Sequence, residues 1–327
     1  MVEGSRIGRR TLFGAGAALA ATGPAAAQDN YPNRPITVVI GFTSAGLTDT
    51  MTRIIAGRMG RELGQNLVVE NRPGAATSTA SAYVAQARPD GYTLLMGTTS
   101  LAINPALQPN LPPRDPRQEL APVGMAYESP FLLIVRAALP IRDLAGFVAH
   151  ARAHPGQIQM GSSGIGATNH LLITMLAREA GIRLEHIPYR GAAAALIDLR
   201  GGRISATWAT PPDAMPLVQD GTARVLAISS HERMRTLPDI PAAMESLPGV
   251  HGTFWQGLFA PPGTPEPVLG RLGAALDTAT RDPEIARRAE EGGVVMRPGD
   301  AAALRAHLAS ETERWSKVIR SAKIKVE

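Results

Sequence analysis

The stretch ITVVIGFTSAGLTDTMTRIIAGRMGREL, residues 36–63, decides the fold class of this 327-residue chain. ITVVI (36–40) is a β-branched run with the length of a buried strand, and the residues after the loop carry a helical pattern that ends at Gly64. LVVE (67–70) and YTLLMG (92–97) continue the alternation of strands with helices. Because such alternation produces parallel sheets with helices on their faces, the sequence predicts an α/β fold.

A second series of strand and helix patterns begins after the proline-rich segment 104–120, which we interpret as a link. FLLIVR (131–136), IQMGSS (158–163) and RVLAISS (224–230) are strand candidates of this second half. The chain from residue 253 onward predicts two helices separated by RDPE and a final amphipathic helix.

We therefore predict two α/β lobes, each a mostly parallel sheet flanked by helices, with a ligand cleft between them. The chain is expected to cross between the lobes near 123–130 and again near 229–254. Two crossings make a hinge, which allows the lobes to close on a small molecule. The predicted division gives 28–125 plus 250–327 to lobe 1 and 126–249 to lobe 2.

The first 27 residues predict an export signal. Arg9 and Arg10 precede a short run of small apolar residues, and Ala25–Ala27 offer a cleavage site near Ala27. The paired arginines resemble a twin-arginine signal, although the general secretory route stays open. We expect a periplasmic protein with no further membrane segment.

Composition excludes several functional classes. The chain has no cysteine, so it has no disulfide framework, thiolate metal site or cysteine nucleophile. The formal charge of +5 is modest and no dense basic stripe accompanies it, which argues against nucleic acid. We expect no metal and no cofactor, and a monomer.

Three loops share a composition of small and hydroxyl residues. FTSAGLTD (42–49), GTTSLAINP (97–105) and GSSGIGATNH (161–170) each follow a predicted strand and lead into a predicted helix. In open α/β sheets the ligand binds beyond the carboxyl ends of the strands, where such loops offer backbone N–H groups and a helix N-terminus to an anion. The alternative is that their serines, threonines and asparagine only cap helices.

No catalytic or nucleotide motif accompanies these loops. GSSGIGATNH lacks the lysine of a phosphate-binding P-loop and the glycine order of a dinucleotide fingerprint, and no G-x-S-x-G elbow is present. We expect Asp49 to accept loop N–H groups rather than act as a base. Arg190 is either a bidentate partner for a carboxylate or a surface arginine.

Taken in order, several segments resemble the tripartite tricarboxylate transporter substrate-binding proteins, the Bug family of periplasmic receptors, over about residues 31–325. The segments are YPNRPITVVIGF, the TD before the first helix, VVENRPGA, ARPDGYTLLMGT, INPAL, APVGM, GSSGIGATNHL, IPYRGAAAALIDLRGG, RVLAISSHERMRTLPDIPA and GLFAPPGTP. The resemblance implies a class II-like periplasmic binding fold that captures a small carboxylate, without catalysis, for delivery to membrane transporter subunits.

The resemblance also implies which residues hold the ligand carboxylate. They are Thr43, Ser44, Ala45, Gly46, Leu47, Thr48 and Asp49 in the first loop, and Ser162, Ser163, Gly164 and Thr168 in the second lobe. To these we add, from their loops and chemistry, Thr98, Thr99, Arg190 and Ala209.

Two departures from the family pattern bear on the ligand. Ala45, Gly46 and Leu47 stand where the family has a run of glycines, and Ala209 with Thr210 stand where many members carry an acid. A ligand amino group would lose its counter-charge, which favours di- or tricarboxylates or aromatic acids over amino acids. The rival hypotheses are a secreted hydrolase acting on a carboxylated substrate and a structural or adhesive envelope protein.

Overall fold

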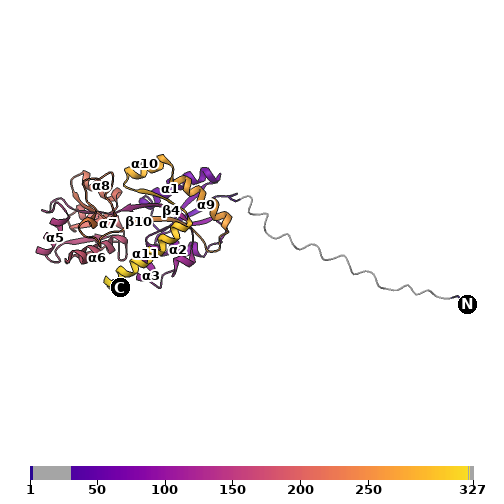
Figure 1. Ribbon diagram of the computed structural model, residues 1–327, viewed down its shortest axis with the longest axis horizontal. Coiled ribbons are helices and arrows are strands. Elements are labelled where there is room, and N and C mark those ends of the chain that lie inside the picture. The colour runs from indigo at the N-terminus through magenta and orange to yellow at the C-terminus, as the bar shows by residue number, and fades with distance from the viewer. Residues whose placement is uncertain (3–30, 323, 325–327) are drawn as a thin grey trace.

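The computed structural model of the protein describes residues 1–2, 31–322 and 324. Two lobes lie side by side along its long axis, with β4 and β10 passing between them (Figure 1). The α/β fold with two lobes that the sequence predicts is confirmed. The predicted export signal lies almost entirely outside the described residues.

The first sheet has six strands in the order β11-β4-β10-β3-β1-β2. Its strands are β1 Ile36–Ile40, β2 Leu67–Asn71, β3 Thr93–Thr98, β4 Ala121–Pro130, β10 Thr253–Ala260 and β11 Val295–Gly299. β1 pairs in parallel with β2 and β3, and Ile36, Val38, Val39 and Ile40 are all buried. Burial on both faces explains why this strand is a continuous apolar run.

The second sheet has five strands in the order β7-β6-β8-β5-β9. Its strands are β5 Leu132–Arg136, β6 Gln159–Ser162, β7 Glu185–Pro188, β8 Ala206–Ala209 and β9 Ala223–Ile228. β6 runs parallel to β7 and β8, while β5 runs antiparallel to β8 and β9.

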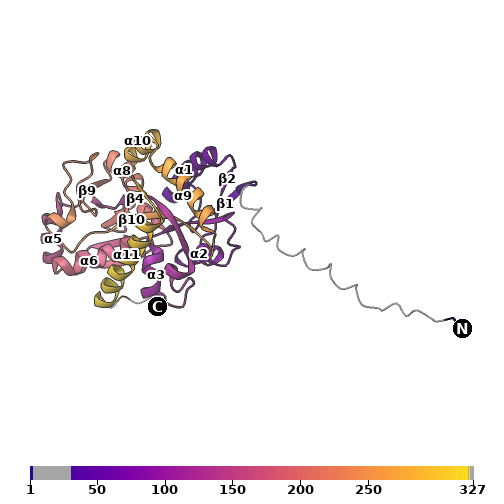
Figure 2. The same cartoon turned by 45° about the vertical axis from the view of Figure 1, so that its right-hand side comes forward.

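Helices cover both sheets, as two views of the molecule show (Figures 1 and 2). They are α1 Leu47–Leu63, α2 Ser78–Ala85, α3 Ser100–Leu107, α4 Pro116–Glu119, α5 Leu144–Ala153, α6 Thr168–Ala180, α7 Ala192–Arg200, α8 Pro211–Gln219, α9 Glu266–Thr280, α10 Pro283–Glu291 and α11 Ala301–Ala322. Two short 3-10 helices, η2 Ala75–Thr77 and η3 Ala243–Glu245, complete the elements.

The expectation of mostly parallel sheets was wrong, because both sheets are mixed. β4 and β10 enter the first sheet antiparallel to their neighbours, since each brings the chain to or from the other lobe. Both strands fall in segments that we interpreted only as crossings or loops. The proline-rich link 104–120 also contains helical residues, from the end of α3 and all of α4.

The crossing segments meet at the buried Ser229. Its N–H donates to the carbonyl oxygen of Phe131 (2.8 Å), and its hydroxyl accepts from the N–H of Phe131 (2.8 Å). The same hydroxyl donates to the carbonyl oxygen of Gly252 (2.6 Å). β4 keeps residues 126–130 in the first sheet, and the chain enters the second sheet at Leu132. The division of the chain into lobes at 125/126 and 249/250 remains a proposal.

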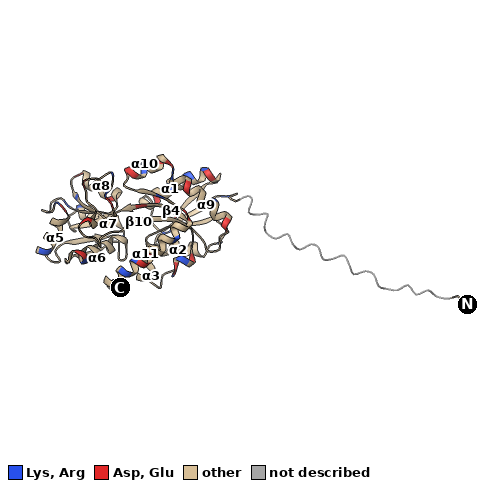
Figure 3. Ribbon diagram, in the orientation of Figure 1, with Lys and Arg blue, Asp and Glu red and all other residues tan. Residues whose placement is uncertain are grey.

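Charges of both signs are interspersed over the two lobes in the view of Figure 3. Within the described residues, no helix is long and apolar enough to span a bilayer. Among the same residues, no group of three or more histidine, aspartate or glutamate side chains is placed to hold a metal ion.

Candidate functional site

The predicted loops lie at the carboxyl ends of parallel strands. The first loop, 42–49, follows β1 and leads into α1. The second-lobe loop, 161–170, follows β6 and leads into α6. The caps of these two helices, Gly46 and Ala167, make no side-chain hydrogen bond to the helix, so no side chain occupies the N–H groups of the first turn. An uncapped helix N-terminus attracts an anion through these N–H groups and the helix dipole.

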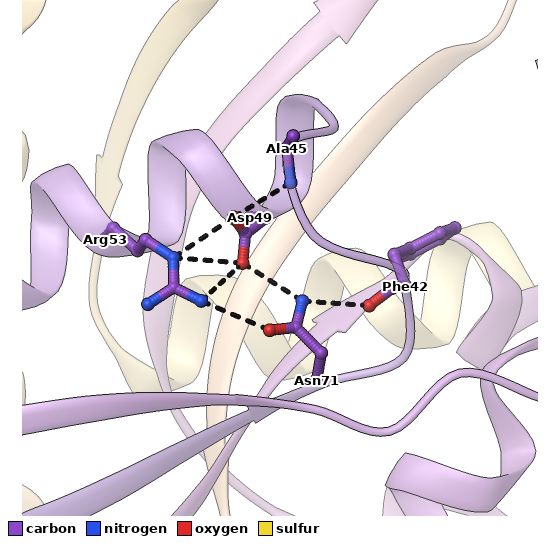
Figure 4. Close-up of polar contacts among 5 residues, drawn as sticks. All are labelled: Phe42, Ala45, Asp49, Arg53 and Asn71. Carbon is purple, nitrogen blue, oxygen red and sulfur yellow. Dashed lines mark hydrogen bonds and ion pairs between the residues drawn. The ribbon is translucent and has the colours of Figure 1, made fainter. Parts of the chain in front are cut away.

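The first loop is exposed to solvent, and the buried carboxylate of Asp49 is hydrogen-bonded to it. Thr43, Ser44, Ala45 and Gly46 are exposed, whereas Thr48 and Asp49 are buried. Asp49 Oδ2 accepts the N–H of Ala45 at 3.1 Å, as we expected from the sequence (Figure 4).

Two further side chains complete the environment of Asp49. Arg53 donates Nη2–H to Asp49 Oδ1 at 2.9 Å, and Asn71 donates Nδ2–H to the same oxygen at 3.0 Å (Figure 4). Asn71 also donates to the carbonyl oxygen of Phe42 at 3.0 Å. The hydrogen bonds from Arg53 are the largest cause that lowers the pKa of Asp49 to about 2. Asp49 is therefore ionised, and its charge is balanced by Arg53. Its oxygens accept the hydrogen bonds that hold the loop in place.

Sequence reasoning missed Arg53 and Asn71. Arg53 lies four residues after Asp49 on α1, a spacing at which side chains of a helix meet. That spacing was a readable signal, whereas the approach of Asn71 from the end of β2 depends on the sheet order.

Backbone strain is concentrated beside the first loop. Ala45 has a φ of +67°, and Ala75, Ala76 and Thr77 have φ values of +46°, +51° and +71°. Left-handed backbone favours glycine, so alanine and threonine are strained there. The segment 75–77 packs against the start of the first loop, because a Cβ on Gly41 would lie 2.6 Å from Thr77 Cβ.

The other first-lobe hydroxyls predicted for the ligand are bonded within the protein. Thr48 Oγ1 accepts from Gln256 Nε2 at 3.2 Å, and Thr98 Oγ1 accepts from the N–H of Ser100 at 3.3 Å. Thr99 Oγ1 accepts from the N–H of Trp255 at 3.2 Å. All three threonines are buried; the bonds of Thr48 and Thr99 reach β10, and the bond of Thr98 joins the end of β3 to the start of α3. Their contact with a ligand stays a prediction.

The second loop is held by side chains of its own lobe. Ser163 donates both its N–H and its hydroxyl to Asn169 Oδ1, at 3.3 and 3.0 Å. Ser162 is fully buried, and its hydroxyl lies 2.7 Å from His186 Nε2. Gly166 donates its N–H to His170 Nδ1 at 3.1 Å. These contacts of His170 and His186 were not predicted from the sequence.

The remaining predicted residues differ in exposure. Gly164 is half-buried with a φ of +136°, Thr168 and Ala209 are buried, and Arg190 is exposed. Leu47 is half-buried at the first residue of α1. Where each of these residues would lie against a ligand stays a prediction.

The two lobes touch on opposite sides of the crossing strands. On the side of α3 and α6, a Cβ on Gly166 would lie 2.1 Å from Leu107 Cδ2. On the side of α8 and α10, a Cβ on Gly293 would lie 2.4 Å from Pro211 Cβ (Figures 1 and 2). An exposed ion pair between Arg235 and Glu290 (3.4 Å) adds to this second contact.

A cavity of about 550 Å³ lies away from the loops, where β1 and β3 begin, at the opposite edge of the sheet. Arg34, Tyr83, Arg88, Asp90 and Tyr92 are among the residues that line it.

Two donor-rich loops on two lobes joined by crossing strands define the class of two-lobed solute-binding proteins. Residues 51–324 match the sequence profile of the tripartite tricarboxylate transporter family receptor. The chain therefore belongs to this receptor family.

Known proteins resemble the chain over nearly its whole length. A protein encoded in the tcbD-tcbE intergenic region of Pseudomonas sp. (strain P51) is 36% identical over 320 residues, covering 96% of this chain and 95% of that protein. The periplasmic binding protein BugD is 30% identical with a TM-score of 0.82, over 91% of this chain and 100% of BugD. Rpa4515 of R. palustris, solved with adipate, is 31% identical with a TM-score of 0.84, over 90% of this chain and 99% of that one.

Proposed function

We propose that the protein is a periplasmic receptor that captures a small organic carboxylate between loops 43–49 and 162–168 and presents it to transporter subunits in the membrane. The supporting observation is the pair of uncapped N-termini of α1 and α6, one on each lobe, at the carboxyl ends of β1 and β6. Hydrogen bonds from such N–H groups to a carboxylate are charge-assisted and stronger than neutral ones. The adipate in the structure of Rpa4515 supports the same chemical class.

The charge balance of the first loop supports an anionic ligand. Arg53 neutralises Asp49, so the buried carboxylate does not repel an anion at the loop above it. The absence of an acid at Ala209 favours plain di- or tricarboxylates, or aromatic acids, over amino acids.

The burial of Ser162 and the hydrogen-bond partners of His186 support a binding role without catalysis. A serine beside a histidine is the arrangement that an acyl-transfer enzyme would need. Ser162 is fully buried, however, and no carboxylate is bonded to His186 within the described residues. A triad also requires a third group to orient the histidine.

The experiment that tests receptor against hydrolase follows both stability and ligand integrity. The mature protein is incubated with di- and tricarboxylates, aromatic acids and amino acids while its melting temperature is recorded. A receptor is stabilised by ligand, by about 2.7 kcal/mol at 100 times Kd. Stabilisation with every acid intact supports the proposal, consumption of an acid supports the hydrolase, and no shift with any compound supports an envelope structural protein.

The remaining parts of the proposal concern the chain ends and the assembly. We propose that residues 1–27 direct export and are removed near Ala27, and that the mature receptor is a monomer. Mass spectrometry of periplasmic protein tests the cleavage, and light scattering of the eluting protein tests the monomer.

A further inference from the structure

Two imidazole rings stack below the second-lobe loop. His170 lies in the first turn of α6, and His186 lies on β7. Their ring centroids are 4.0 Å apart, with 12° between the ring planes. His170 is only 9% exposed, and His186 is half-buried. Neither ring is used in the ligand site that we propose.

Each ring is bonded to the loop above it. His170 Nδ1 accepts the N–H of Gly166 at 3.1 Å, which requires a lone pair on Nδ1 and places any ring proton of the neutral form on Nε2. His186 Nε2 lies 2.7 Å from the hydroxyl of Ser162, which in turn accepts the N–H of Gly164 at 3.2 Å. The turn 162–166 is therefore hydrogen-bonded to both histidines. In its bond, Nδ1 of His170 can only be the acceptor.

The surroundings do not favour a charged ring. β6 and β8, which pack against α6, contain no charged residue, and α3 meets the loop through the apolar Leu107. β7 contributes Glu185, which is exposed and points to the face opposite His186.

Within the described residues, no charged side chain is bonded to either ring. Asp198 of α7 is bonded to Tyr189 and Arg203, and α11 contacts α6 through a bond from Arg178 to Ser321. Burial, and to a smaller extent the neighbouring His186, lowers the pKa of His170 to about 4. Burial also lowers the pKa of His186. Both rings are consequently neutral at pH 7.

We propose that His170 and His186 are positioning residues that hold the turn 162–166 in its ligand-binding form, and that a proton on His170 loosens the turn and weakens binding. A proton on His170 Nδ1 would turn the acceptor of the Gly166 N–H into a donor facing it. A second charge on the stacked ring would add repulsion at close range. The effect on the turn stands by itself, whereas the effect on binding rests on the proposed function.

The matched variants keep the hydrogen bond and remove the titration. In His170→Asn the side-chain oxygen can occupy the acceptor position of Nδ1, and in His186→Gln the amide can replace Nε2. His154→Asn, at the exposed residue that follows α5, controls for the loss of a histidine. The turn is followed by the NMR amide signal of Gly166, and binding by calorimetry with adipate, from pH 7.5 to 3.5.

The proposal predicts that the Gly166 amide shifts with the midpoint of the His170 ring in the wild type and in His154→Asn, but not in His170→Asn. The ratio of wild-type to His170→Asn Kd for adipate should rise about fourfold between pH 7.5 and 3.5, the factor for one site with a pKa of about 4. Protonation of adipate cancels in this ratio.

An unchanged ratio, or a Gly166 amide that ignores the titration of His170 in the wild type, overturns the proposal. The wild-type NMR titration keeps the test decisive if a variant does not fold. Failure of adipate and the other acids to bind at pH 7.5 would instead count against the proposed function and leave the Gly166 result standing.

Discussion

The carboxylate of Asp49 accepts the backbone N–H of Ala45 at 3.1 Å across the turn that enters α1. Ala45 has a left-handed backbone, which an alanine adopts only when its surroundings impose it. Asp49 is therefore the group that fixes the strained turn, and Arg53 and Asn71 fix Asp49. The geometry of the exposed donors at 43–46 depends on this buried group.

Replacing Asp49 should consequently affect both stability and binding. In Asp49→Asn the ion pair with Arg53 is lost, and we expect the free energy of unfolding to fall by about 1–3 kcal/mol. Urea denaturation measures the change. Asp90→Asn is the control, because its ion pair with Arg34 is exposed and should contribute less than about 1 kcal/mol. Equal effects of the two substitutions would contradict this role for Asp49.

The contribution of Asp49 should depend on pH in a defined window. Its pKa is lowered in the folded state to about 2 from 3.8, so its stabilisation is complete above pH 4 and is lost as the pH falls toward 2. The difference in unfolding free energy between wild type and Asp49→Asn should be constant from pH 5 to 8 and shrink below pH 4. A difference that persists undiminished at pH 2.5 would argue against the assignment.

A bulky side chain in the second loop should block the ligand. Ser163 is half-buried between Gly164 and the buried Ser162, so we expect Ser163→Trp to fill the space and remove binding while the fold remains. Calorimetry with the acids that stabilise the wild type measures the loss, and circular dichroism checks the fold. Ser310→Trp, on the exposed face of α11, should bind as the wild type does. Unchanged affinity in Ser163→Trp would exclude this loop as the site.

The contact between the lobes at Gly166 should also control affinity. Gly166→Ala places a Cβ 2.1 Å from Leu107 Cδ2, so Leu107 or the lobe contact that it makes must shift, and we expect binding to weaken at least about tenfold, or 1.4 kcal/mol. Gly181→Ala is the matched control, since its φ is also positive but nothing lies within 4 Å of its Cβ. Leu107→Ala should restore part of the affinity in the double variant. Equal losses from both glycine substitutions would trace the effect to backbone strain alone.

The sequence predicts the elements that carry their signal locally. The apolar run 36–40 becomes the buried β1, and the caps that end α1 and α6 fall at Gly64 and Gly181. β4 and β10 escape prediction because their antiparallel pairing joins segments more than a hundred residues apart. A helix is predicted after the loop 97–105, but not that α3 begins at Ser100 and continues through Pro105, a residue that normally ends a helix.

In the candidate site, too, some features are predictable from the local sequence and others depend on tertiary packing. The donor-rich loops are visible from composition, and the acceptor role of Asp49 follows from its place at the head of a helix. The partners of Thr99 and Ser162 are not visible, because Trp255 and His186 reach them only through tertiary packing. Composition alone does not show that several of these hydroxyls are also bonded within the fold.

The most direct test of the central claim is a crystal structure of the receptor with a carboxylate that raises its melting temperature. We predict that a carboxylate group of the ligand lies within hydrogen-bond distance of backbone N–H groups in both 43–49 and 162–168. A ligand seated instead in the cavity lined by Arg34, Arg88 and Tyr92, or held by one lobe alone, would contradict the account.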